Sequence, residues 1–207
     1  LGLNKNKELT ILEKINNKYE DLKLYKNKNY AEQFLSIVNS FKEKELEMKI
    51  KHLKLTSTVA QSLYKVMAYK DEYEVARLYT DGRFKKYLNE NFEESYKIKF
   101  YLSPPLLGLK DKKTGAPKKI KFSYFMIYVF KLLAKIKFIR NTIFDPFSYT
   151  SERKKERELI KLYFSTVNIV LPIINKNNYN EACELFSSFD LVKGYGHVKL
   201  KNLENFF

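Results

Sequence analysis

The sequence predicts a mainly α-helical protein with one β-hairpin, and three observations support this fold class. Apolar residues recur three and four positions apart over several stretches, which is the period of an amphipathic helix. Residues 97–122 alternate polar and apolar on both sides of a turn-rich loop, which is typical of a hairpin with a long loop. Apolar residues make up 44% of the 207 positions, enough to bury a core. We therefore expect amphipathic helices packed around one core, in a single domain over residues 1–207.

Three helices are predicted in the first part of the chain. Residues 1–29 contain an entry helix, and a second amphipathic helix is expected over Tyr30–Ile50. A third begins near Thr58, which has the spacing of a capping box with Gln61, and continues to about Tyr79.

Charged residues interrupt the apolar pattern of that third helix. Lys70 and Glu74 are four positions apart and Glu74 and Arg77 are three apart, so ion pairs can form along one helix face. The interpretation we favour is an exposed ladder worth about a few tenths of a kcal/mol per pair. A buried network that contacts a neighbour is the alternative, which makes Lys70, Glu74 and Arg77 candidate interface residues.

The predicted hairpin lies in the most positively charged part of the chain. The segment from Lys97 to Arg140 contains twelve basic residues and one acidic residue, a net charge of +11. Four lysines in or beside the hairpin loop are candidate contacts for an anion or an acidic partner: Lys112, Lys113, Lys118 and Lys119.

Three further helices are predicted after the hairpin. Tyr124–Ile139 is so apolar that we expect it in the core, with a helix lying on a membrane surface as the alternative. Thr150 or Ser151 can cap the next helix, whose apolar stripe ends near Pro172. The last, short helix carries Cys183 on its apolar side, where a buried and inert thiol is expected.

The whole chain has a formal net charge of +15, which by itself suggests an acidic partner. The basic residues are 34 Lys and only 5 Arg, and Asn occurs 17 times, a composition that an AT-rich genome encodes. Arg binds phosphate through two parallel hydrogen bonds, so its scarcity weighs against a nucleic-acid site. We favour a solvated lysine face or a subunit contact.

No motif for catalysis, cofactor binding or metal binding can be read, so we assign no residue to these roles. The sequence has no glycine-rich phosphate loop and no GxSxG, HExxH or CxxC pattern. One Cys and two His offer too few ligands for a metal centre, and His197, which follows the flexible glycines Gly194 and Gly196, is the one histidine we regard as a site candidate. The low cysteine content suggests the cytoplasm, and the longest apolar run, seven residues, is too short to cross a bilayer.

Four blocks of the sequence resemble the C-terminal region of indolepyruvate ferredoxin oxidoreductase and occur in that family's order. The blocks are Tyr64–Tyr79, Phe100–Leu107, Phe144–Arg153 and Gly194–Lys199. The resemblance extends from about Tyr30 to about Leu203, and Ser148 stands where the family pattern has Gly.

The resemblance implies that the chain is the C-terminal accessory part of a larger enzyme that depends on thiamine diphosphate. Members of this family of 2-oxoacid:ferredoxin oxidoreductases decarboxylate aryl-pyruvates oxidatively to acyl-CoA and pass electrons through a 4Fe-4S iron–sulfur cluster to ferredoxin. Their GDG…N thiamine-diphosphate motif and cluster cysteines lie upstream and are missing from this sequence. Thiamine diphosphate, the 4Fe-4S cluster and CoA are therefore implied for the parent enzyme and not for these residues. Because the first residue is Leu1 and not Met, we expect the chain to be part of a longer protein.

The role expected from the resemblance is packing against other domains or subunits of the parent oxidoreductase, or docking of ferredoxin. Ferredoxins are acidic, so a lysine-rich hairpin would attract them. The competing hypothesis is a stand-alone basic helical module that binds nucleic acid, with lysines on the phosphates and aromatic rings under the bases, or that binds an anionic membrane surface.

Overall fold

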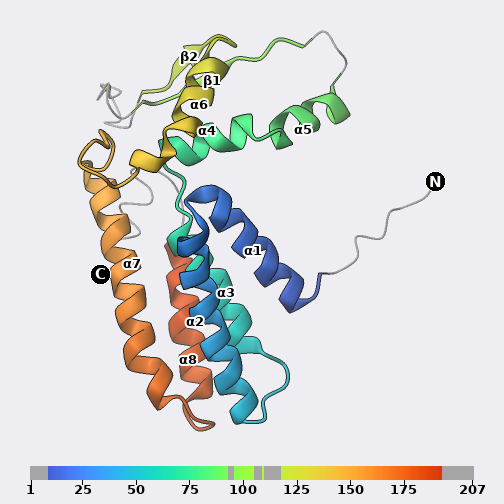
Figure 1. Cartoon of the computed structure of the whole chain (residues 1–207), viewed down its shortest axis with the longest axis vertical. Helices are drawn as coiled ribbons and strands as arrows, with labels where there is room; N and C mark the ends of the chain where they lie inside the picture. The colour runs from blue at the N-terminus through green and yellow to red at the C-terminus, as the bar shows by residue number, and fades with distance from the viewer. Residues whose placement is uncertain (1–8, 93–95, 105–108, 110–117, 193–207) are drawn as a thin grey trace, which may run out of the picture. The chain divides into compact units, whose positions relative to one another are not determined.

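The computed structural model describes residues 9–92, 96–104, 109 and 118–192, and within them the chain is mainly helical with one antiparallel hairpin, as the sequence predicts (Figure 1). The elements are α1 (Ile11–Tyr25), α2 (Lys28–Glu47), α3 (Lys54–Met67), α4 (Glu72–Thr80), α5 (Arg83–Asn91), β1 (Phe100–Leu102), β2 (Ile120–Phe122), α6 (Met126–Lys135), α7 (Ser151–Val170) and α8 (Tyr179–Ser188). No helix in the described part of the chain is both long and apolar enough to cross a lipid bilayer.

The described residues form two compact units, which we describe separately. Unit 1 consists of residues 9–68 and 156–192, and unit 2 consists of the described residues between 69 and 155. A single domain over residues 1–207 stays a prediction.

Unit 1 is a helical bundle in which α1, α2, α3 and α8 lie side by side (Figure 1). Its core is built from completely buried side chains on these helices, among them Leu22, Phe34, Leu63 and Phe186. The predicted stripe of α7 joins this core through Tyr163, whose hydroxyl lies 2.7 Å from the Ser62 hydroxyl. The helical periodicity of the sequence therefore identified the faces that pack together.

The start of α3 differs from the prediction. The helix begins four residues before Thr58, whose hydroxyl donates a hydrogen bond to the Lys54 carbonyl inside the helix (2.9 Å) and caps nothing. The carboxylate of Glu45, a completely buried residue of α2, instead accepts hydrogen bonds from the backbone N–H groups of Leu55 (3.1 Å) and Thr56 (2.8 Å). A distant side chain thus satisfies the open N–H groups of the first turn, which a local sequence pattern cannot reveal.

The segment predicted as one helix to about Tyr79 is two helices. α3 ends at Met67, and α4 begins after Asp71, whose side chain accepts a hydrogen bond from the Glu74 N–H (2.7 Å). Because an N-cap residue has extended backbone, Asp71 cannot be the interior of a continuous helix.

Unit 2 contains α4, α5, the hairpin and α6. The strands are shorter than predicted and pair antiparallel with Phe100 opposite Phe122 and Leu102 opposite Ile120. Phe100 is buried with Ile127 and Phe130 of α6 and Ala76 of α4, so one face of the hairpin covers a second small core. The loop at 110–117 lies outside the described residues.

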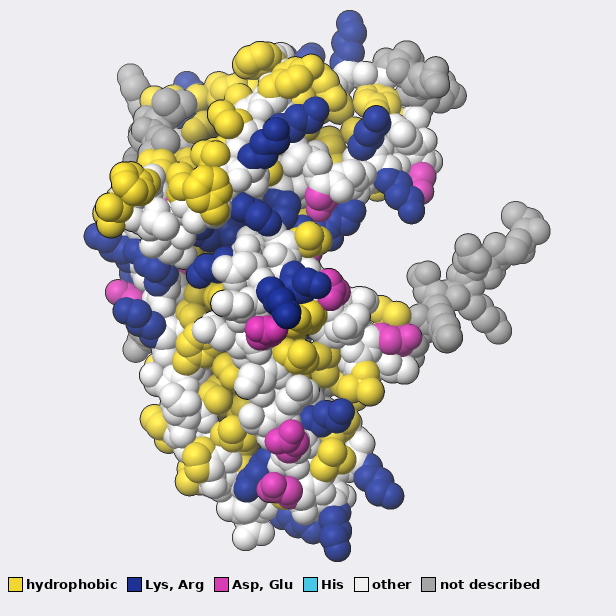
Figure 2. Space-filling model, viewed as in Figure 1, with side chains coloured by type: hydrophobic (Ala, Val, Ile, Leu, Met, Phe, Trp, Pro, Cys, Tyr) yellow, Lys and Arg dark blue, Asp and Glu magenta, His cyan; other side chains and the backbone are white. Residues whose placement is uncertain are grey.

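α6 is shorter and less buried than the sequence predicts. It starts at Met126 with no side-chain cap, and it ends at Lys135 before a 3₁₀ turn. Ile127 and Phe130 are buried, but Phe125 is 69% exposed and Tyr128 is 58% exposed. Hydrophobic side chains gather over β2 and α6 with basic side chains among them (Figure 2). The helix therefore has one core face and one exposed apolar face.

The C-terminal helices agree with the prediction. The Thr150 hydroxyl accepts a hydrogen bond from the Arg153 N–H (3.4 Å) at the start of α7, and Pro172 lies in the 3₁₀ turn that ends this helix. Cys183 is buried on α8, and burial raises the pKa of its thiol. An inert thiol follows, because the reactive form of cysteine is the thiolate.

Candidate functional site

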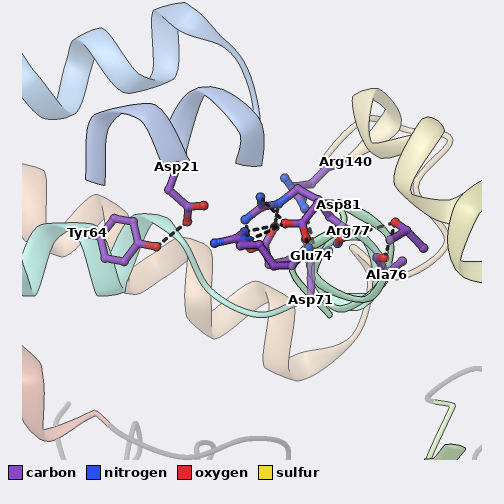
Figure 3. Close-up of polar contacts among 10 residues, drawn as sticks. Asp21, Tyr64, Asp71, Glu74, Ala76, Arg77, Asp81 and Arg140 are labelled. Atoms are coloured by element: carbon purple, nitrogen blue, oxygen red, sulfur yellow. Dashed lines mark hydrogen bonds and ion pairs between the residues drawn. The ribbon is translucent and has the colours of Figure 1, made fainter. Parts of the chain in front are cut away.

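The first half of α4 carries a buried ionic network in unit 2. Asp71, the N-cap residue, forms a two-point ion pair with Arg140, with Nε–Oδ2 at 2.5 Å and Nη2–Oδ1 at 2.9 Å (Figure 3). Both side chains are about 2–3% exposed. Two-point pairing with a carboxylate uses the planar fork of the guanidinium, and Lys could not reproduce it.

One turn further along α4, Glu74 and Arg77 form a second two-point pair. Arg77 donates from Nε to Glu74 Oε2 (2.8 Å) and from Nη2 to Glu74 Oε1 (2.6 Å), and it also reaches Asp81 (3.4 Å) (Figure 3). Glu74 and Arg77 are buried, so the favoured interpretation of an exposed ladder is wrong for this pair. The contact with a neighbour that the alternative includes stays a prediction. Lys70 is exposed and lies in the non-helical segment between α3 and α4.

A third carboxylate, Asp145, connects α4 to the turn before α7. It accepts hydrogen bonds from the Tyr73 hydroxyl (3.0 Å) and from the backbone N–H groups of Asn141 (2.8 Å) and Phe147 (3.0 Å). Burial and the hydrogen bond to Asp145 raise the pKa of Tyr73. The turn is therefore held by a side chain that organises two backbone N–H groups at once.

Arg153, in the first turn of α7, completes the network. Its guanidinium donates to Glu72 Oε1 (3.3 Å) and lies over the Tyr69 ring at 5.4 Å. Burial raises the pKa of the Glu72 carboxyl, and the positive charge of Arg153 opposes this shift.

This network fixes α4 against residues 140–153 and uses three of the five arginines of the chain. It joins two of the blocks that carry the resemblance, Tyr64–Tyr79 and Phe144–Arg153, through Tyr73 and Asp145. Buried ion pairs contribute little net stability on average, but breaking one is costly. The arrangement therefore positions backbone segments, and nothing in it presents a nucleophile to a cavity.

The second half of α4 borders a groove of about 950 Å³ in unit 2. Its walls come from α4, α5, the hairpin and α6, and its lining residues share two properties, aromatic rings and positive charge. The aromatic lining residues are Tyr79, Phe84, Tyr96, Phe122 and Tyr124, and the basic ones are Lys85, Lys97, Lys99, Lys121 and Lys131. The lining contains no described Asp or Glu, so the groove has a positive potential that suits an anion.

The lysines predicted as partner contacts lie in different places. Lys118 and Lys119 are exposed just before β2 and are not among the groove residues. Lys112 and Lys113 lie outside the described residues, as does His197. The candidate residues are therefore not assembled into one site within the described part of the chain.

The groove residues are not predicted as a site from the sequence, although a signal exists there. Four of its five lysines fall in the segment from Lys97 to Arg140 that carries a net charge of +11. Lys97 and Lys99 alternate with apolar residues directly before β1. Lys85 comes from α5, and its contribution depends on the fold of unit 2.

Metal ligation has no support in the described residues, among which no group of three or more His, Cys, Asp or Glu could hold a metal ion.

Most of the chain matches the model of one protein family. The model of a family of unknown function, DUF6537, matches residues 11–207, so the chain belongs to this family. No curated protein and no solved structure matches the chain.

Proposed function

We propose that the chain is the C-terminal accessory part of a 2-oxoacid:ferredoxin oxidoreductase that acts on aryl-pyruvates. In this proposal the chain is not catalytic, and its role is to pack against other parts of the enzyme and to dock an acidic partner such as ferredoxin. The thiamine diphosphate, the iron–sulfur cluster and the CoA site belong to the rest of the enzyme, which functions in the cytoplasm.

The observation that carries the docking role is the combination of exposed lysines and exposed aromatic rings in unit 2. Lys118, Lys119 and Tyr101 are exposed on the hairpin, and Phe125 and Tyr128 are exposed at α6. Protein interfaces are enriched in aromatic residues at their centre, and complementary charge accelerates association. The four ordered blocks of resemblance support the choice of the parent enzyme.

The competing function, binding of nucleic acid, is favoured by the lysines and aromatic rings that share one groove. The placement of arginines argues against it. Arg77, Arg140 and Arg153 are buried in internal ion pairs and cannot reach a phosphate. Docking of an acidic protein is therefore the function we favour.

The test measures binding of the chain to an acidic ferredoxin by biolayer interferometry at 20, 150 and 500 mM NaCl, conditions chosen to span a Debye length of roughly 20 to 4 Å. The hairpin variant replaces four lysines with Gln: Lys112, Lys113, Lys118 and Lys119. The control variant has the same change of charge in unit 1 and replaces exposed lysines with Gln: Lys28, Lys51, Lys161 and Lys176.

We expect the hairpin variant to lose about tenfold or more in affinity at the lowest salt and to show a flatter salt dependence. The control variant should stay within about twofold. Equal losses in both variants, or no binding by the wild-type chain at 20 mM NaCl, would reject the docking role. Tighter binding to a single-stranded oligonucleotide than to ferredoxin would support the competing function.

A further inference from the structure

The groove in unit 2 has the properties of a small-molecule site. Its volume of about 950 Å³ lies within the range of roughly 300–1,000 Å³ that is typical of ligand pockets. It is bounded by four separate elements, α4, α5, the hairpin and α6, so its walls are held by the second core and not by a single loop.

The floor of the groove offers flat apolar surfaces. Tyr79 stacks on Phe130 with an interplanar angle of 7° and a centroid distance of 5.2 Å, and it meets Phe84 edge-on at 4.9 Å. Tyr79, Phe84 and Phe122 are only half-buried, and all three line the groove. Tyr124 is more than half exposed at the rim. A planar aromatic ring can stack on such surfaces.

The rim of the groove is positively charged. All five lysines that line it are exposed, and none of them forms an ion pair with a carboxylate in the described part of the chain. Asp81 is the acidic residue next to the groove in sequence, and it is already paired with Arg77 and Arg83. A ligand with a single carboxylate would leave most of the positive charge uncompensated, whereas a polyphosphate carries several negative charges.

We propose that this groove binds a nucleoside di- or triphosphate. The base stacks among Tyr79, Phe84 and Tyr124, and the phosphate chain contacts the lysines of the hairpin and α6. The proposal is independent of the docking role, because Lys118 and Lys119 do not line the groove.

The test titrates fluorescent N-methylanthraniloyl-ADP with the full chain and follows anisotropy, with unlabelled ADP, adenosine and pyrophosphate as competitors. Two variants probe the two halves of the ligand: the double substitution Lys99→Gln and Lys121→Gln, and the single substitution Tyr124→Ala. These side chains are exposed, so the variants should fold, and circular dichroism checks this. The matched control is Lys118→Gln with Lys119→Gln, which has the same charge change on the same hairpin.

We expect ADP to compete better than either adenosine or pyrophosphate alone. The Lys99 and Lys121 variant should bind about tenfold more weakly, and Tyr124→Ala about fivefold more weakly, because phosphate contacts and base stacking each supply part of the affinity. The Lys118 and Lys119 control should bind within about twofold of wild type.

Three results would overturn the proposal. Pyrophosphate that competes as well as ADP, with no effect of Tyr124→Ala, would show a simple anion site. Equal weakening by the groove variant and the control would show non-specific charge attraction. A single-stranded oligonucleotide that binds the groove and resists displacement by excess ADP would assign it to nucleic acid.

Discussion

Arg140 and Asp71 are 69 positions apart in the sequence and form a two-point ion pair from which water is excluded. Asp71 caps α4 through the Glu74 N–H, while Arg140 follows the 3₁₀ turn after α6. The Arg140 guanidinium also lies 5.6 Å from the centre of the Tyr73 ring. One carboxylate therefore both starts a helix and anchors the segment that leads into α7.

Replacing Arg140 with Met should be strongly destabilising, because Asp71 would then be a buried charge without its partner. We expect a loss of about 3–5 kcal/mol in the free energy of unfolding, measured by urea denaturation. Arg83→Met is the control, since Arg83 is 59% exposed and its ion pair with Asp81 is worth about 1 kcal/mol at most. A loss for Arg140→Met no larger than for Arg83→Met would contradict this account of the network.

Replacing Glu45 with Ala should destabilise the start of α3. The substitution leaves the N–H and hydroxyl groups of Thr56 and the hydroxyl of Tyr179 without their acceptor, at about 1–3 kcal/mol for each buried unsatisfied group, and it removes one of the two acceptors of the Leu55 N–H. We expect a total loss of at least about 3 kcal/mol and faster amide hydrogen exchange at Leu55 and Thr56. The control is Glu47→Ala at the exposed end of the same helix, which should change stability by about 0.5 kcal/mol or less. Unchanged exchange at Leu55 and Thr56 would refute the capping role of Glu45.

The stability of the protein should fall at alkaline pH because of three buried tyrosines. Burial raises the pKa of Tyr73, Tyr163 and Tyr179 above the value of about 10 for an exposed tyrosine. Above pH 10 the unfolded chain releases these phenolic protons while the native state keeps them. The stabilisation is therefore complete below pH 10 and is lost as the pH rises above it, by up to about 1.4 kcal/mol per pH unit for each tyrosine.

Unfolding free energies measured between pH 8 and pH 11 check this prediction. Tyr163→Phe should reduce the slope above pH 10, whereas Phe at the exposed Tyr149 should leave it unchanged. Ultraviolet titration in the native state should show that these three residues ionise above the pH at which they ionise in the unfolded chain. A pH-independent stability up to pH 11 would be inconsistent with their burial.

Replacing Gly82 with Ala should cost about 1 kcal/mol, although the added methyl group meets no atom within 4 Å. Gly82 has φ of +94° at the start of α5, a backbone conformation that is strained for residues with a Cβ. Gly82→Asn should cost less, because Asn tolerates positive φ better than Ala does. Thermal denaturation of the two variants measures the order, and an Ala variant as stable as wild type would contradict it.

The elements that depend on local pattern were predictable. The capping residue Thr150 lies beside the helix it starts, and the alternation around Phe100 and Phe122 identified both strands. The errors lie where a residue far along the chain decides the structure. Glu45 moves the start of α3 toward the N-terminus, and Arg140 forms a buried ion pair with Asp71, the residue that caps α4.

The candidate site was predictable only in part for the same reason. The surplus of lysines after Lys97 indicated where positive charge would be concentrated. The aromatic floor was not visible, because Tyr79 and Phe84 come from α4 and α5 and meet the hairpin lysines only after folding. The ion pair of Glu74 and Arg77 has the spacing of an ordinary surface pair, and only tertiary packing decides that it is buried.

Arginine and lysine have different roles in unit 2. Buried arginines hold the fold, and exposed lysines give the groove its positive charge. The guanidinium groups of Arg77, Arg140 and Arg153 are internal, whereas the exposed charge around the groove is carried by primary amines. Acylation of a lysine amine removes its positive charge, whereas a buried guanidinium is not modified. Acetylation of the groove lysines can therefore remove the positive charge that they carry, while the ion pairs of Arg77, Arg140 and Arg153 stay intact.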